Sequence, residues 1–161
     1  MLEAAARAAG TPLALVRLFY AVDLRYGVLV DIATRVHAGQ PVPVTMGWVN
    51  VIWQGDANAL ALAALAQASA PEPLVVNVAG PEVLRVAELA RALAARLGRT
   101  PRLVGHESSD ALLSDSTRMR TLLGDPLMSL DTLLDWVADW VSRGGRLLGK
   151  PTKFERRDGA F

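Results

Sequence analysis

Short runs of β-branched and apolar residues alternate with segments of helical period along this chain, and this alternation constrains the fold more than any other feature. The first run, residues 13–22, is almost continuously apolar, which is typical of a strand buried on both faces of a parallel sheet. A second run at residues 74–78 follows a segment rich in alanine and leucine. The pattern therefore predicts an α/β layered fold.

Helical period is clearest at residues 83–97, where apolar side chains share one face and arginines lie elsewhere. A second helix is predicted from Gly27, with Gly39 in the position of a left-handed closing residue. The other expected elements are the end of a helix at residues 2–9, extended segments from Pro41 and at residues 101–104, and helices from Ser116 to Gly124 and from Ser129 to Arg143.

Composition excludes several classes of protein. The 161 residues suit one domain, and a hydrophobic content of 52% is too high for a disordered chain. With 17 basic and 16 acidic residues the net charge is +1, too balanced for a nucleic-acid binder. The longest apolar run contains Arg17 and is too short to span a membrane. We therefore expect a cytoplasmic protein that binds neither nucleic acid nor membrane.

The absence of cysteine excludes disulfides, thiolate metal sites and a cysteine nucleophile. The two histidines have no partner at metal-ligand spacing, and we expect no metal site. Asp131, Asp135 and Asp139 share one helical face, which we interpret as a solvated acidic face with Asp139 paired to Arg143. Asp56 is predicted to cap the helix that follows it.

Four stretches, taken in order, carry a resemblance to a known family. Residues 48–56 (WVNVIWQGD) form an aromatic-rich strand ending in an acidic residue, and residues 74–82 (LVVNVAGPE) form a strand that turns through a glycine. Residues 17–27 (RLFYAVDLRYG) and residues 116–126 (STRMRTLLGDP) complete the set. Together they resemble the extended short-chain dehydrogenase/reductase family, also called the NAD-dependent epimerase/dehydratase family, over about residues 11–141.

The resemblance implies that this chain is the C-terminal, substrate-side half of such an enzyme. The implied fold is a partial Rossmann-like parallel sheet with a small substrate-binding α/β lobe, and the N-terminal dinucleotide-binding half is absent. The lobe would occupy residues 1–149, and residues 150–161 would form a tail without periodicity.

The resemblance also implies site residues. Residues 17–27 are similar to the strand and loop that pass beside the nicotinamide ring, which places Tyr20, Ala21 and Val22 near the cofactor. The implied substrate contacts are Arg25, Tyr26, Trp48, Asn50 and Trp53. Where sugar-nucleotide enzymes of the family place an arginine for the diphosphate, this chain has Val49 and Asn50. A nucleotide sugar and a smaller carbonyl or hydroxyl compound are both open as the substrate.

The catalytic and cofactor-binding motifs of the family have no counterpart in the sequence. None of the 13 glycines falls in a G-x-x-G-x-x-G spacing, which lets backbone N–H groups approach a pyrophosphate. Neither tyrosine is followed four residues later by the lysine that would lower its pKa, since the only lysines are Lys150 and Lys153. We therefore predict no catalytic residue and no oxidoreduction by this chain alone. A complete family member would use NAD or NADP, but this chain alone is expected to bind neither.

Two functions are consistent with these observations. The first is the substrate-binding half of an NAD(P)-dependent epimerase, dehydratase or reductase, with the dinucleotide-binding half lost or supplied by another chain. The second is a non-enzymatic module that self-associates as a homodimer, because residues 13–22 would otherwise expose a bare strand edge. A complete small enzyme with an unrelated site has no nucleophile, base or metal cluster to support it.

Overall fold

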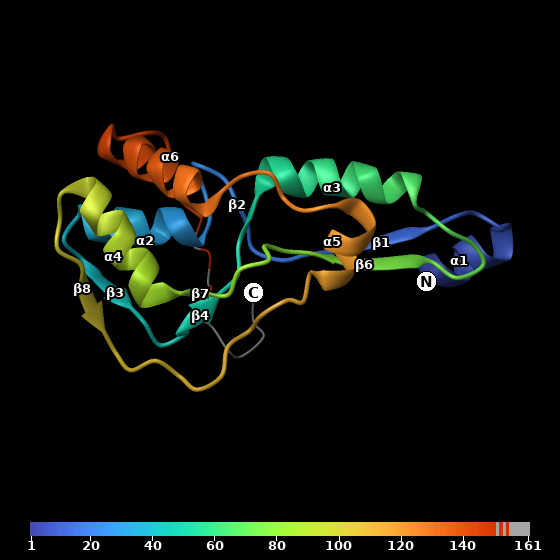
Figure 1. The fold of residues 1–161 in the computed structure, drawn as a ribbon, viewed down its shortest axis with the longest axis horizontal. Coiled ribbons are helices and arrows are strands. Elements are labelled where there is room, and N and C mark those ends of the chain that lie inside the picture. Colours follow the sequence, from blue (N-terminus) through green and yellow to red (C-terminus); the bar gives the residue numbers. More distant parts are fainter. Residues whose placement is uncertain (151, 153, 155–161) are drawn as a thin grey trace.

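The structure is a computed structural model that describes residues 1–150 together with Thr152 and Phe154. Helices and short strands alternate along the described residues (Figure 1). The helices are α1 (Leu2–Ala9), α2 (Val28–His37), α3 (Gln54–Ala66), α4 (Val86–Leu97), α5 (Thr117–Leu123) and α6 (Leu130–Ser142). The strands are β1 (Ala14–Leu18), β2 (Ala21–Val22), β3 (Pro41–Pro43), β4 (Trp48–Val49), β5 (Ile52–Trp53), β6 (Leu74–Val78), β7 (Leu84–Arg85) and β8 (Arg102–Val104).

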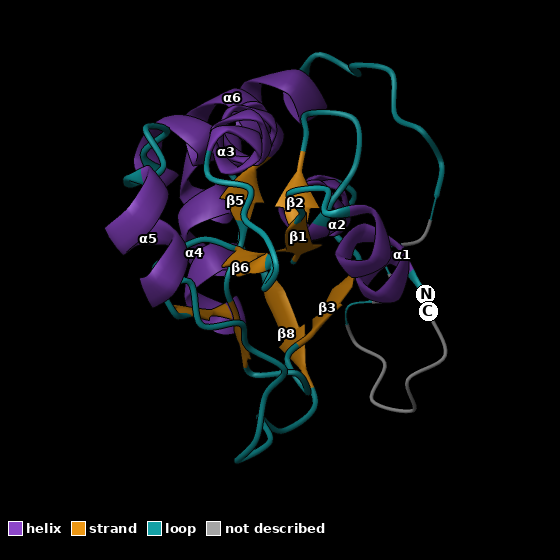
Figure 2. Ribbon diagram, turned by 90° about the vertical axis from the view of Figure 1, so that its right-hand side faces the viewer, coloured by secondary structure: helices purple, strands orange, loops and turns teal. Residues whose placement is uncertain are grey.

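Most strand pairs are parallel, as the alternation of strands and helices predicts. The longest pair joins β1 to β6 in parallel, from Ala14 opposite Leu74 to Leu18 opposite Val78. The pairs β2–β5 and β3–β8 are also parallel, whereas β4 and β7 are antiparallel. Figure 2 shows α5 on the β6 side of the longest pair and α1 on the β1 side, while α3 contacts both strands. The α/β fold class with parallel sheet pieces is confirmed.

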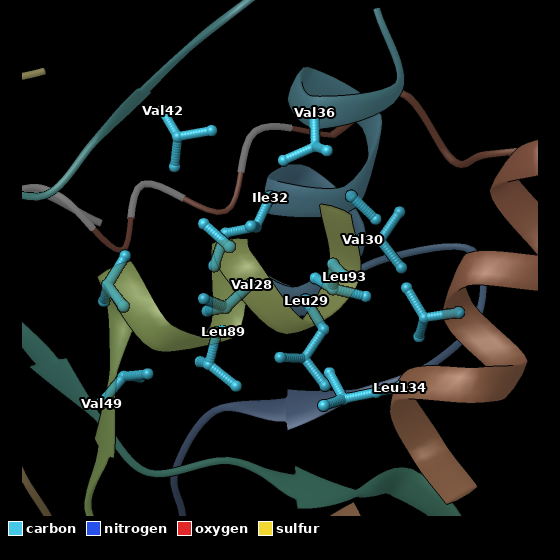
Figure 3. Packing of buried hydrophobic residues seen from close by; sticks show 14 of the residues in the cluster. Val28, Leu29, Val30, Ile32, Val36, Val42, Val49, Leu89, Leu93 and Leu134 are labelled. Carbon is cyan, nitrogen blue, oxygen red and sulfur yellow. The ribbon is translucent and has the colours of Figure 1, made fainter. Parts of the chain in front are cut away.

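The larger hydrophobic core lies among α2, α4 and α6 (Figure 3). Leu29 and Ile32 of α2 are buried against Leu89 and Leu93 of α4, and Leu134 of α6 closes the cluster. These residues lie at the helical spacing that the sequence shows, so the predicted apolar faces are the faces that pack. A smaller core joins α3 to β6 and α5. No helix in the described part of the chain has the length and apolar character needed to cross a membrane.

Two predicted elements differ from the structure. The strand expected at residues 13–22 is broken, because β1 ends at Leu18 and β2 begins at Ala21. It is not buried on both faces, because the exposed fractions of Val16 and Leu18 are 36% and 57%. Among the described residues only β6 pairs with β1, so one edge of β1 is open as well. The helix expected from residue 83 begins at Val86, because the preceding residues pair with β4 as β7.

Most of the predicted tail, residues 151, 153 and 155–161, lies outside the described residues. The two described residues beyond Lys150 both contact the lobe. Phe154 is buried in the larger core, and the Thr152 hydroxyl donates a hydrogen bond to the Asp31 carboxylate. The division of the chain at residue 150 stays a prediction.

Candidate functional site

A cavity of about 370 Å³ lies where β1 gives way to β2, and we call it the β2 cavity. Its walls include Tyr20, Ala21, Val22 and Tyr26, so four of the residues predicted to contact cofactor or substrate surround one space. Gln54 and Thr152 also line it, and none of its described lining residues carries a charge. The cavity is therefore suited to neutral groups that form hydrogen bonds, such as hydroxyls and carbonyls.

The backbone around Val22 brings these side chains together. Tyr20 has a φ of 35°, which is uncommon for a residue other than glycine, and its carbonyl accepts a hydrogen bond from the Ile52 N–H at 3.2 Å. The chain then reverses in a tight turn in which the Asp23 N–H donates to the Tyr26 carbonyl at 2.9 Å. At Gly27 an added Cβ would lie 2.8 Å from Val22 Cγ1. Only glycine allows this close approach.

The side chain of Tyr20 combines an aromatic wall with an unsatisfied polar group. Its ring lies 4.3 Å from that of Phe19, in a tilted arrangement. Its hydroxyl is buried and has no hydrogen-bond partner among the described residues. Burial raises the pKa of the Tyr20 phenol above its ordinary value, because it penalises the charged form. The phenol is therefore protonated and neutral at physiological pH.

A second cavity of about 430 Å³, which we call the α2 cavity, lies beside α2 and has Tyr26 as a wall in common with the β2 cavity. Arg25 reaches it from the turn after β2 and is held by the Asp23 carboxylate, with Nε–Oδ1 and Nη2–Oδ2 distances of 3.3 and 2.9 Å. This hydrogen-bonded pair lowers the pKa of Asp23 and raises that of Arg25. The Leu148 N–H donates to the Arg25 carbonyl at 3.0 Å and fixes the turn from the other side.

Asn50 lies outside both cavities, and its amide is engaged with backbone groups. Its Nδ2 donates to the carbonyls of Gly80 and Ser114 at 3.0 and 2.7 Å, and its Oδ1 accepts from the Ser114 N–H at 3.3 Å. The side chain is 2% exposed. Asn50 thus ties the turn after β6 to the segment before α5, and its predicted contact with substrate stays a prediction.

Trp48 and Trp53 lie at two further places. Trp48 is partly exposed and lies beneath the Arg85 guanidinium, 5.8 Å from the ring centroid. Trp53 lines a separate hollow of about 270 Å³ and meets Trp136 edge to face at 5.9 Å. Of the five predicted substrate contacts, the structure therefore brings together Arg25 and Tyr26 and separates the other three.

Several polar residues of the cavities were not predicted from the sequence, among them Gln54, Thr152 and Thr34. Gln54 directly follows Trp53 at the end of the aromatic strand. This position is a signal in the sequence from which Gln54 could have been predicted as a site residue. Thr152 and Thr34 reach the cavities only through the fold, from the C-terminal segment and from the middle of α2. No local pattern marks them.

The predicted cap at Asp56 is wrong. Helix α3 begins at Gln54, two residues before Asp56, so Asp56 lies within the first turn. Its Oδ2 instead accepts a hydrogen bond from the Met128 N–H at 2.9 Å, which anchors the segment before α6. A carboxylate in this position still interacts favourably with the helix dipole.

The acidic face of α6 is partly neutralised by a residue that the sequence did not indicate. Arg96 of α4 binds Asp135 at 2.6 Å through Nε and also pairs with Asp131. The predicted pair between Asp139 and Arg143 is confirmed. Across the described ranges, no three acidic or histidine side chains are grouped as a metal site would require.

Gly80 lies in the turn between β6 and β7, ahead of α4, and tests whether a dinucleotide pyrophosphate fits there. A Cβ at this position would lie 1.8 Å from the Val51 carbonyl oxygen. The absence of a side chain at Gly80 therefore lets the segment that contains Val51 cross close to it. The space beside Gly80 holds the Val51 backbone. On its Cβ side, Gly80 therefore leaves no space for a pyrophosphate.

Comparisons with known proteins show likeness only among solved structures. No family model and no curated protein matches the sequence. The UDP-glucuronic acid 4-epimerase of Bacillus cereus in complex with NAD superposes with a TM-score of 0.70 at 16% identity, over 88% of this chain and 48% of that one. A UDP-galactose 4-epimerase gives a TM-score of 0.66 at 23% identity, with coverages of 88% and 49%. For the UDP-glucose 4-epimerase of Thermus thermophilus the values are 0.64 and 19%, with coverages of 89% and 50%.

This chain thus spans about half the length of the solved structures that it matches. The likeness establishes the fold, which is that of half a Rossmann-type epimerase. It confirms the predicted fold and is consistent with the predicted C-terminal half.

Proposed function

We propose that this chain is the substrate-binding half of an NAD(P)-dependent epimerase, dehydratase or reductase. The observation that carries the proposal is the meeting of Tyr20, Ala21, Val22 and Tyr26 at the β2 cavity. The fold around this cavity is that of half an epimerase, and the Bacillus cereus neighbour is an NAD complex.

In this proposal the chain binds and orients a small molecule next to a reacting carbon. The β2 cavity has no charged wall among its described residues, and the apolar side chains of Leu18, Val22 and Val28 form part of its lining. Apolar walls beside a few polar groups are typical of sites that bind small molecules. The dinucleotide supplies the hydride, and the unit that holds it supplies the groups that move protons.

In this proposal the dinucleotide is held by a unit other than these residues, which is supported by the Val51 backbone that occupies the Cβ side of Gly80. Calorimetric titration of the isolated chain with NAD and with NADP tests this division. We expect no saturable heat with either nucleotide. Saturable binding with a Kd below about 1 mM would contradict the proposal.

The cavity itself is tested with neutral compounds that carry hydroxyl or carbonyl groups, such as polyols, ketoses and hydroxyketones. The proposal expects at least one of them to bind saturably, and Ala21→Phe, which fills the cavity, to abolish that binding. Ala66→Phe on the exposed end of α3 is the matched control and should leave binding unchanged. Loss of binding in both variants, or in neither, would place the compound elsewhere.

A homodimeric, non-enzymatic module is the second candidate, and the surface of β1 favours it. Among the described residues β1 pairs only with β6, Leu18 is 57% exposed, and α1 buries none of its side chains. An open strand edge of this kind can pair with a second copy. Sedimentation equilibrium should then show a dimer. A strictly monomeric chain that unfolds cooperatively would count against this candidate.

A further inference from the structure

The described residues near the C-terminus are attached to the lobe at three places. The Leu148 N–H donates a hydrogen bond to the Arg25 carbonyl at 3.0 Å, in the turn after β2. The Thr152 hydroxyl donates to the Asp31 carboxylate of α2. Phe154 is 3% exposed and belongs to the larger core. A segment held by a buried aromatic ring and by hydrogen bonds is a packed part of the lobe.

These attachments lie on the elements that form the β2 cavity. Val22 and Val28 line the cavity and belong to the same buried cluster as Phe154. The turn to which Leu148 bonds carries Tyr26, which is another wall of the cavity. The C-terminal segment is therefore packed against the parts of the chain that shape the cavity.

Thr152 is the wall that this segment contributes to the β2 cavity. The other described walls are residues between 18 and 28 together with Gln54. Because Phe154 follows Thr152 by two residues, release of the Phe154 ring from the core would also free Thr152 from the cavity. The hydrogen bond to Asp31 contributes too little to hold the segment by itself. The position of this wall thus depends on the burial of Phe154.

We infer that Phe154 is a positioning residue for the β2 cavity: its burial docks the C-terminal segment, and the docked segment places Thr152 as a wall of the site. The inference rests on the proposed function, because it makes this segment a part of the substrate-binding site. By thermodynamic linkage, a ligand that contacts Thr152 stabilises the docked segment, and release of the segment weakens the binding of that ligand by the same factor.

The test uses the full chain, which contains no cysteine, with a single cysteine introduced in the cavity wall as Ala21→Cys. The rate of its reaction with N-ethylmaleimide, a neutral reagent, measures how often the cavity opens. Adding Phe154→Ala should raise this rate about tenfold or more, because truncation of a buried ring releases the segment. Phe154→Leu keeps an apolar side chain in the core and should restore most of the slow reaction. An unchanged rate in Phe154→Ala would overturn the inference.

Leu134→Ala is the matched control for loss of stability. Leu134 of α6 is buried in the same core as Phe154 and does not line the β2 cavity. Its truncation should lower the midpoint of urea unfolding, as Phe154→Ala does, and leave the reaction rate of Ala21→Cys within about twofold. Equal acceleration by the two truncations would show that Phe154 contributes only to overall stability, and would overturn the inference.

Thr152→Val tests the same inference with the core intact. The substitution keeps the size of the side chain and removes its hydrogen bond to Asp31. It should raise the reaction rate of Ala21→Cys about threefold, which is less than the effect of Phe154→Ala. If Phe154→Ala does not fold, this variant decides the question, because a rate equal to that of the unmodified segment would overturn the inference.

Ligand binding separates the inference from the proposed function. Glycerol, fructose and dihydroxyacetone represent the polyols, ketoses and hydroxyketones, and those that bind the unmodified chain should bind Phe154→Ala at least about fivefold more weakly. Faster reaction of Ala21→Cys in Phe154→Ala, with no binding of any neutral compound to the unmodified chain, would contradict the proposed function alone. Normal binding to the unmodified chain, with an unchanged reaction rate in Phe154→Ala, would overturn the inference alone.

Discussion

Two buried positions, Asn50 and Gly80, show how strongly single residues depend on contacts that only the fold creates. Both were noticed in the sequence, the first as a substrate contact and the second as a turn glycine. In the structure they meet, because Asn50 Nδ2 donates to the Gly80 carbonyl while Val51 passes over Gly80. The sequence marked these positions, but their roles follow from a crossing between residues thirty positions apart.

Gly80→Ala should destabilise the chain by at least about 3 kcal/mol, because the new Cβ would overlap a backbone oxygen that cannot rotate away. Gly98→Ala is the comparison: Gly98 has a φ of 62° and open space around it, so the cost is only that of a left-handed alanine, about 1 kcal/mol. Urea unfolding measures both. A smaller loss for Gly80→Ala than for Gly98→Ala would show that the crossing is not tight.

Asn50→Ala should cost about 2–3 kcal/mol of unfolding free energy, because it leaves buried groups of Gly80 and Ser114 without partners. A side chain kept mainly for substrate would behave differently, since its removal would change stability by less than about 0.5 kcal/mol. The same urea experiment distinguishes the two roles. A stability equal to that of the unmodified chain would instead support the role of Asn50 as a substrate contact.

At the scale of elements, the periodicity of apolar residues correctly predicted the helices whose buried face lies within one short segment of sequence. Helices α2 and α4 have their apolar stripes within a dozen residues, and Gly39 and Gly98 end them with φ values of 67° and 62°. The break at Tyr20 was not predictable, because it depends on Ile52 bonding to the Tyr20 carbonyl. The pairing of β7 with β4 was missed for the same reason.

The loop after β8 is held to β7 by a pair that should respond to acid. Arg85 binds both Glu107 carboxylate oxygens, at 2.7–3.0 Å, and lowers the pKa of Glu107. A lowered folded pKa gives stability that is fully present above the ordinary glutamate pKa of about 4.3 and is lost as the pH falls through the lowered value.

Glu107→Gln should therefore be less stable than the unmodified chain at pH 6, and the difference should disappear by about pH 2. Urea midpoints measured across this range provide the test. Glu88→Gln is the matched control, because Glu88 lies 3.7 Å from the same arginine and is more exposed. A difference that persists at low pH would mean that the amide disturbs the loop in some way other than loss of charge.

At the scale of the whole molecule, the structure is two-sided. Helices α2, α4 and α6 enclose a core at one end of the molecule, and α1 lies at the other end (Figure 1). Val16 and Leu18 of β1 are exposed, and α1 has no buried residue. The sequence indicated that a strand at this position would lack neighbours, because it reads as an interior strand with nothing predicted beside it. It did not indicate which residues would be exposed, since that depends on α3 covering one face only.

Leu18→Lys should lower any self-association that uses this edge by about tenfold or more, because a charge on an edge strand opposes pairing. Sedimentation equilibrium of the variant measures the change. Leu62→Lys, at an exposed position of α3, is the control for added charge. Equal effects of the two substitutions would show that β1 is not the contact.

The central claim is that this chain forms a site for substrate at the β2 cavity and leaves the dinucleotide to another unit. NMR titration of one labelled sample tests both parts, first with the neutral compounds and then with NAD. We expect saturable movement of the Tyr20, Ala21, Val22 and Tyr26 signals with at least one neutral compound and none with NAD. Saturable movement with NAD, centred on the backbone around Gly80, would contradict it.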